Sequence, residues 1–147
     1  MTPYLDFTFL ARLLFHERAS RQAVETLNAF PPPFRLNDLH VLQVENFARQ
    51  AEDHDARAIP LVKRGLGWWR NYHTELVFTV GSIEWKPAYA RAIAVTRESN
   101  GWHGNPSATL HLAAAELAGA THLLSFDNRQ RALAAKRGFT VLPETIE

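Results

Sequence analysis

The stretch that decides the fold is His122-Leu123-Leu124-Ser125-Phe126-Asp127-Asn128-Arg129, near the C-terminus. A short apolar run ends on a single acid, and a helical pattern begins immediately after it. The start of the chain has the same arrangement, because Tyr4-Leu5-Asp6 is followed by a helical run from Thr8. In open parallel α/β sheets, ligands bind beyond the carboxyl ends of the strands. Acids at two such strand ends therefore predict a shared site, most simply for a metal ion.

Apolar periodicity and turn residues divide the whole chain into alternating strands and helices. Pro31-Pro32-Pro33 stops one helix, because proline cannot continue a helix, and glycines at 119 and 138 end two others. This alternation predicts one α/β domain, residues 1–147, with a parallel sheet and helices on both of its faces. Strands are expected at about 3–6, 34–36, 76–80, 122–126 and 140–142. Helices are expected at about 20–30, 56–73, 84–99, 106–117 and 129–137. Two further helices are expected to begin at residue 8 and at residue 37 or 38.

Composition excludes several classes of protein. Of 147 residues, 46% are hydrophobic, which excludes a disordered chain. The formal net charge of +1 neither indicates nor excludes a nucleic-acid-binding protein. The absence of cysteine excludes disulfides and thiolate zinc sites, and makes a cytoplasmic location the expectation. Asp6 and Arg12 interrupt the first apolar run, so no signal peptide is expected, and no apolar stretch approaches the ~18 residues of a membrane span.

Three acids carry the chemical argument. Asp6 and Asp127 lie at predicted strand ends, and Glu45 lies on a predicted helix between Val44 and Phe47. Clustered carboxylates suit Mg²⁺ or Mn²⁺, which prefer oxygen ligands. Without a cation, two carboxylates ~5 Å apart repel each other by roughly 3 kcal/mol at an effective dielectric constant near 20. With a cation, a bound water becomes acidic enough to attack a phosphodiester.

Each acid also has a purely structural interpretation. Asp6 and Asp127 each precede a helix and could cap it, and a lone glutamate on a helix such as Glu45 is usually solvated or salt-bridged. The joint placement of the acids favours the metal site over these interpretations.

The chain resembles a PIN domain, and within that family the VapC-type toxins of bacterial toxin–antitoxin pairs. The likeness spans nearly the whole chain, and the order and spacing of its motifs are more specific than any single motif. The matching segments are Tyr4-Leu5-Asp6 with Thr8, Leu39 with Glu45, Leu110-His111-Leu112-Ala113-Ala114-Ala115, Leu124-Ser125-Phe126-Asp127, Arg129-Gln130-x-Ala132-Leu133-Ala134 and Gly138-Phe139-Thr140-Val141.

The resemblance implies a three-layer α/β/α sandwich with a central, mostly parallel sheet, and a Mg²⁺- or Mn²⁺-dependent endoribonuclease. The catalytic acids of the family fall on Asp6, Glu45 and Asp127. Asp6 and Asp127 would hold the metal, directly or through water, and Glu45 would position or deprotonate the attacking water. The hydroxyl residue often found two positions after the first acid falls on Thr8, which is expected near the substrate.

One acid of the family pattern is missing. The family usually has an aspartate three residues before the histidine of the Leu-His-Leu run, and that position here is Ala108. No nearby acid compensates, because Glu98 lies across a loop and Glu116 lies two turns along the helix. The change could be a natural loss of activity or a deliberate substitution that disables a toxin. We therefore expect weak metal binding and impaired cleavage.

Aromatic and histidine side chains add weaker signals. Trp68 and Trp69 stand among basic residues and could stack RNA bases, but a core Trp69 with Trp68 at an oligomer or partner surface is preferred. Trp102 and His103, just before the helix that carries Ala108, are placed to touch substrate. His111 is expected to pack or to make a structural hydrogen bond rather than to bind metal.

Two functions remain in contention. The first is a VapC-type endoribonuclease toxin with an RNA substrate, a cognate antitoxin and a homodimeric state. The second is a naturally non-catalytic PIN-like module that binds protein or RNA. A haloacid-dehalogenase-like phosphatase ranks well below both, because it would need a second acid at position 8, where this chain has threonine. The RNA target cannot be read from the sequence.

Overall fold

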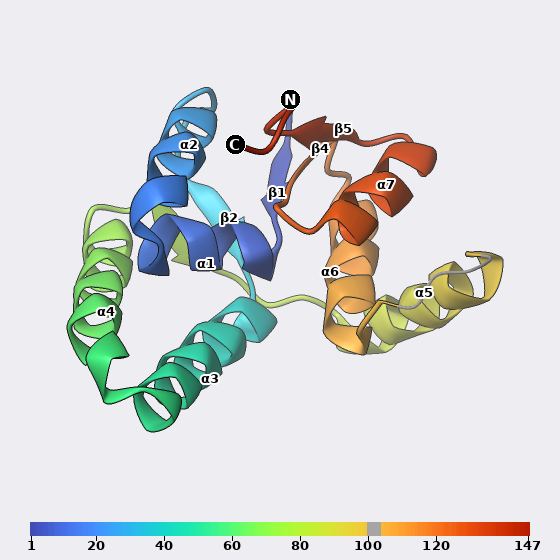
Figure 1. The fold of residues 1–147 in the computed structure, drawn as a ribbon. Coiled ribbons are helices and arrows are strands. Elements are labelled where there is room, and N and C mark those ends of the chain that lie inside the picture. Colours follow the sequence, from blue (N-terminus) through green and yellow to red (C-terminus); the bar gives the residue numbers. More distant parts are fainter. Residues whose placement is uncertain (100–103) are drawn as a thin grey trace. The chain divides into compact units, whose positions relative to one another are not determined.

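The structure is a computed structural model that describes residues 1–99 and 104–147. The chain divides into two compact units, each of which contains a parallel β-sheet (Figure 1). The first unit comprises residues 1–8 and 82–146, and the second comprises residues 9–81 with Glu147. Within the described ranges, no helix combines the length and the apolar character that a bilayer crossing requires.

The first unit is built on three parallel strands in the order β1-β4-β5. Leu5 lies opposite Leu124 in the register of the first pair, so the next residues, Asp6 and Ser125, leave the sheet at the same edge. Its elements are β1 (Pro3–Leu5), α5 (Trp85–Glu98), α6 (Pro106–Leu117), β4 (His122–Leu124), α7 (Asn128–Lys136) and β5 (Thr140–Leu142). The predicted parallel pairing of these strands is confirmed.

The core of this unit lies between the sheet and its helices. Leu123 of β4 is fully buried, and it belongs to one cluster with Leu112 of α6 and Leu133 of α7. Asn105 caps α6 by accepting from the Ala108 amide at 2.8 Å. Gly119 and Gly138 have φ values of 70° and 93°, which favour glycine because a side chain is strained there. Both helices therefore end where expected.

The second unit pairs β2 with β3 in a parallel two-stranded sheet. The cap of α3 is Asn37, one of the two expected starts at 37 or 38, and its side chain accepts from the His40 amide while the His40 ring accepts from the Asn37 amide. Its elements are α1 (Phe7–Phe15, which begins at the end of the first unit), α2 (Glu17–Leu27), β2 (Phe34–Leu36), α3 (Asp38–His54), a 3₁₀ turn (Ala56–Ala58), α4 (Ile59–Thr74) and β3 (Phe78–Val80).

Close packing explains a glycine inside α4. A Cβ built on Gly65 would lie 2.3 Å from the Phe15 ring and 2.6 Å from the Leu14 carbonyl oxygen. The helix therefore continues through Gly65 because glycine lets α4 approach α1 closely, a contact that outweighs its poor helix propensity.

Several predicted boundaries were wrong. The second helix was expected at 20–30 but covers Glu17–Leu27. The strand expected at 122–126 covers only His122–Leu124. Helix α3 runs through the polar residues 52–54 to His54, because a helix tolerates charged residues on its solvent side. The strands also pair as a set of three and a set of two, a division that local patterns do not specify.

Candidate functional site

Asp6 is a buried acid at the end of β1. The residue is only 3% exposed. Its backbone amide donates to the Leu124 carbonyl oxygen at 3.0 Å, which continues the pairing of β1 with β4. Two hydroxyls donate to its carboxylate: Thr8 Oγ1 to Oδ1 at 2.7 Å and Ser125 Oγ to Oδ2 at 2.5 Å. A buried carboxylate needs such donors, because water cannot supply them.

Asp127 is a partly exposed acid at the start of α7. Its Oδ1 accepts from the Arg129 amide at 2.8 Å and from the Gln130 amide at 3.3 Å, so Asp127 is the N-cap of this helix. Its own amide donates to Ser125 Oγ at 3.1 Å. The structural interpretation of Asp127 as a cap is therefore confirmed, and the cap bonds fix the direction of its carboxylate.

The Ser125 hydroxyl brings the two acids together. It donates to the Asp6 carboxylate and accepts from the Asp127 backbone, so one small side chain separates the two residues. Sequence reasoning missed Ser125. The available signal was its position: it follows β4 directly, and in the parallel register it stands opposite Asp6.

Thr8 lies inside α1, which begins one residue earlier than the expected start at Thr8. Its hydroxyl donates to Asp6 and accepts from the Phe126 amide at 2.9 Å, and it lies 3.3 Å from Ser125 Oγ. Thr8 therefore joins the ends of β1 and β4. Its proposed contact with substrate stays a prediction.

Arg131 is a cation beside this edge that sequence reasoning also missed. Its guanidinium donates to the Ser125 carbonyl oxygen at 2.9 Å and to the Pro143 carbonyl oxygen at 2.6 Å. Burial lowers the pKa of Arg131, and the nearby Asp6 carboxylate opposes that shift. Arg131 thus ties the end of β4 to the segment after β5 and places positive charge near Asp6.

Ala108 lies in the first turn of α6, and Gln130 connects it to the acids. The Gln130 side-chain Nε2 donates to the Ala108 carbonyl oxygen at 2.6 Å, while the Gln130 backbone amide donates to Asp127. A continuous series of hydrogen bonds therefore runs from Asp6 through Ser125 and Asp127 to position 108. Within residues 1–99 and 104–147, no three acidic or histidine side chains form a metal-ligating group.

His111, one turn after Ala108, is structural. The residue is 1% exposed, and its Nδ1 lies 2.8 Å from the Tyr4 hydroxyl. This hydrogen bond between α6 and β1 confirms the expectation of a structural role.

For three predicted site residues, a place at this edge stays a prediction. Glu45 is exposed on α3 in the second unit, so its convergence with Asp6 and Asp127 stays a prediction. Trp102 and His103 lie outside the described residues.

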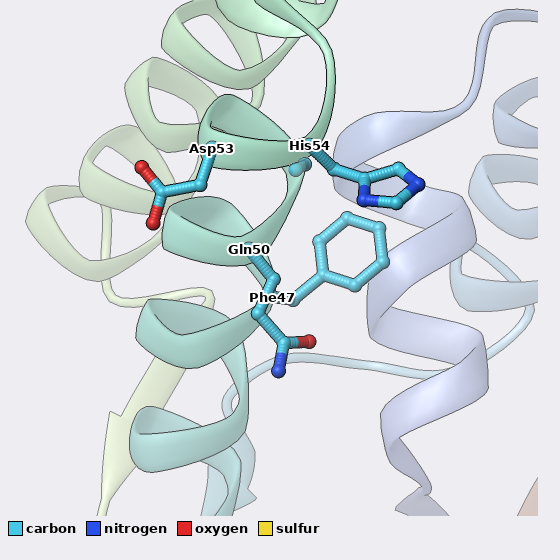
Figure 2. Close-up of a pocket in the computed structure, with 5 residues that line it drawn as sticks. Phe47, Gln50, Asp53 and His54 are labelled. Atoms are coloured by element: carbon cyan, nitrogen blue, oxygen red, sulfur yellow. The ribbon is translucent and has the colours of Figure 1, made fainter.

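The second unit carries two surface depressions. One, of about 530 Å³, lies at the end of α3. Figure 2 shows the rings of Phe47 and His54 on one side of that helix and the Asp53 carboxylate pointing to the other side. The Asp53 carboxylate and the His54 ring thus point in different directions. Phe47 stacks on Phe15 with ring centres 5.0 Å apart. We therefore interpret this depression as a packing surface rather than a polar binding site.

The other depression is a groove of about 560 Å³ between α1, α2 and α4. Leu13, Val24 and Trp68 contribute apolar walls, and Arg21 and Arg64 contribute basic groups. Trp68 is 51% exposed, whereas Trp69 is 7% exposed and lies beside Phe78. The predicted core position of Trp69 is therefore confirmed and Trp68 lies at the surface, whereas an oligomer or partner contact at Trp68 stays a prediction.

A scan against protein-family models finds none that matches this chain, and a search of the curated proteins returns no match.

Proposed function

We propose that this protein is a PIN-domain endoribonuclease of the VapC type, dependent on Mg²⁺ or Mn²⁺ and impaired by Ala108. The observation that supports the proposal is that Ser125 Oγ donates to the Asp6 carboxylate and accepts from the Asp127 backbone amide, where the paired parallel strands β1 and β4 end. Under this proposal, we expect the two units to form a three-layer α/β/α sandwich.

The residues at this edge fit a hard divalent cation, because they offer oxygen atoms and no sulfur or imidazole. Asp6 and Asp127 would hold the cation. Bound there, it would lower the pKa of a water molecule and stabilise charge that develops on a phosphodiester. Ser125 and Thr8 fix both oxygens of Asp6, so this ligand is already oriented. Glu45 would position the attacking water.

The second candidate, a non-catalytic PIN-like binding module, is favoured by one observation. Position 108 offers only a methyl group where the family pattern expects a further carboxylate. Because Asp6 and Asp127 keep an organised set of hydrogen bonds, we prefer the impaired nuclease.

Cleavage of a structured RNA in the presence of Mn²⁺ tests the proposal. Ala108→Asp should raise the cleavage rate by about 10²–10³-fold, the effect of one preorganised group that stabilises charge. Ala108→Asn is the matched control, since it adds a side chain of similar size without the charge. Adding Asp6→Asn to the Ala108→Asp variant should abolish the gain. Equal rates for the native chain and Ala108→Asp would contradict the nuclease and favour the binding module.

We also propose that an antitoxin partner occupies the groove between α1, α2 and α4, and that the protein is a cytoplasmic homodimer. The half-exposed Trp68 beside apolar walls supports a protein interface, since large exposed apolar surface on a protein usually marks one. Light scattering of the purified chain tests the dimer: we expect twice the chain mass, and a monomer at ~100 µM would contradict it.

A further inference from the structure

Gln130 is a fully buried polar residue in the first turn of α7, and its side chain reaches the first turn of α6. The residue is 0% exposed. Its backbone amide donates to Asp127, and its side chain donates to the Ala108 carbonyl oxygen. Gln130 therefore contacts both the last acid of the candidate site and the position where an acid is missing.

The orientation of the Gln130 amide follows from its partner. A carbonyl oxygen lies 2.6 Å from Nε2, and exchanging the amide nitrogen and oxygen would bring two acceptors into contact. The nitrogen must therefore face Ala108, and Oε1 must face away from the Ala108 carbonyl. Oε1 is the buried side-chain polar atom that has no hydrogen-bond partner in the described part of the chain.

A buried acceptor without a donor is costly, by about 1–3 kcal/mol. Such atoms call for a specific explanation, and a water molecule or a bound cation is one of them. Here the atom is an amide carbonyl oxygen, which is a recognised ligand for hard cations. It belongs to the residue whose backbone amide donates to the Asp127 carboxylate and whose side chain reaches the Ala108 carbonyl oxygen.

We propose that Gln130 Oε1 supplies the third protein oxygen for the cation held by Asp6 and Asp127, directly or through one water, in place of the carboxylate that Ala108 does not provide. This inference rests on the proposed function. A neutral amide attracts a divalent cation less strongly than a carboxylate does, so the chain should bind metal more weakly than its Ala108→Asp variant. The hydrogen bond from Nε2 to Ala108 holds the amide in the orientation that presents Oε1.

Two substitutions separate this role from a purely structural one. Gln130→Met and Gln130→Glu both remove the donor to the Ala108 carbonyl oxygen, so both should lower stability in the absence of metal. Methionine also removes the oxygen, whereas glutamate keeps an oxygen and adds charge. A structural role moves both variants in the same direction, but a ligand role moves their metal affinities in opposite directions.

The experiment measures Mn²⁺ affinity of the full chain by the electron paramagnetic resonance signal of free Mn²⁺, with circular dichroism to confirm folding. Gln130→Met should weaken binding roughly 10-fold, the lower end of the range for groups that support a metal site. Gln130→Glu should bind Mn²⁺ more tightly than the native chain. In the Ala108→Asp variant, Gln130→Met should lower the Mn²⁺ affinity by less than it does in the native chain. The exposed Gln50→Met is the matched control and should change nothing.

The outcomes distinguish this inference from the proposed function. If Asp6→Asn abolishes Mn²⁺ binding but neither Gln130 variant changes the affinity, the role of Gln130 is wrong and the metal site stands. If Asp6→Asn leaves Mn²⁺ binding unchanged, or if the native chain binds no Mn²⁺, then both the role of Gln130 and the proposed metal site are wrong. Should Gln130→Met fail to fold, the tighter binding of Gln130→Glu still decides the question, since unchanged or weaker binding would overturn the inference.

Discussion

Ser125→Ala should destabilise the protein more than the loss of a serine hydroxyl usually does. The substitution removes a side-chain donor to the buried Asp6 carboxylate and the acceptor of the Asp127 amide. Alanine fits the space, because it only deletes one atom. The effect therefore reports on the hydrogen bonds themselves.

The magnitude follows from these contacts. A hydrogen bond to a charged group contributes about 1.5–3 kcal/mol, more than one between neutral groups. The Asp127 amide adds little, because Asp127 is partly exposed and water can replace the lost acceptor. We expect a loss of about 2–3 kcal/mol in the free energy of unfolding, which corresponds to a fall in Tm of roughly 5–10 °C for a chain of this size.

Urea and thermal unfolding followed by circular dichroism measure this loss. Ser82→Ala is the matched control, because Ser82 is exposed in the same unit, and it should stay within about 0.5 kcal/mol of the native chain. Thr8→Val and Ser125→Ala should not add, since both hydroxyls donate to the same carboxylate. If Ser125→Ala unfolds like the Ser82 control, the linkage of the two acids through this hydroxyl is refuted.

Three further predictions concern the second unit. In urea unfolding, Gly65→Ala should cost about 1–3 kcal/mol by overpacking, whereas Gly67→Ala, whose nearest neighbour to an added Cβ is 4.0 Å away, should stabilise by about 0.5–1 kcal/mol. Trp69→Ala should cost about 3–5 kcal/mol, and the half-exposed Trp68→Ala far less, so equal losses would contradict the assigned burial. Burial lowers the pKa of His73, so the folded state resists protonation, and stability should fall as the pH drops below about 6.5 toward the folded pKa. His73→Gln should weaken this dependence of Tm on pH, and an unchanged slope between about pH 7.5 and 5.5 would count against it.

The acids at the strand ends were predictable from sequence because the signals are local. An apolar run that ends on an acid before a helical pattern is written in consecutive residues, and it placed Asp6 and Asp127 correctly after β1 and β4. Asn37 and Gly138 were equally readable, because a helix end is decided by the residues beside it. The strands were predicted to be parallel, and they are.

Only the tertiary structure decided which side chains serve these acids. Ser125 and Gln130 look unremarkable in sequence, and their importance comes from the register of β1 with β4 and from the contact between α6 and α7. Glycine has a poor helix propensity, and only the structure shows that Phe15 lies against Gly65. The physical reason is common to all three: propensity and periodicity act between near neighbours in the chain, whereas hydrogen bonds and packing act between atoms that only folding brings together.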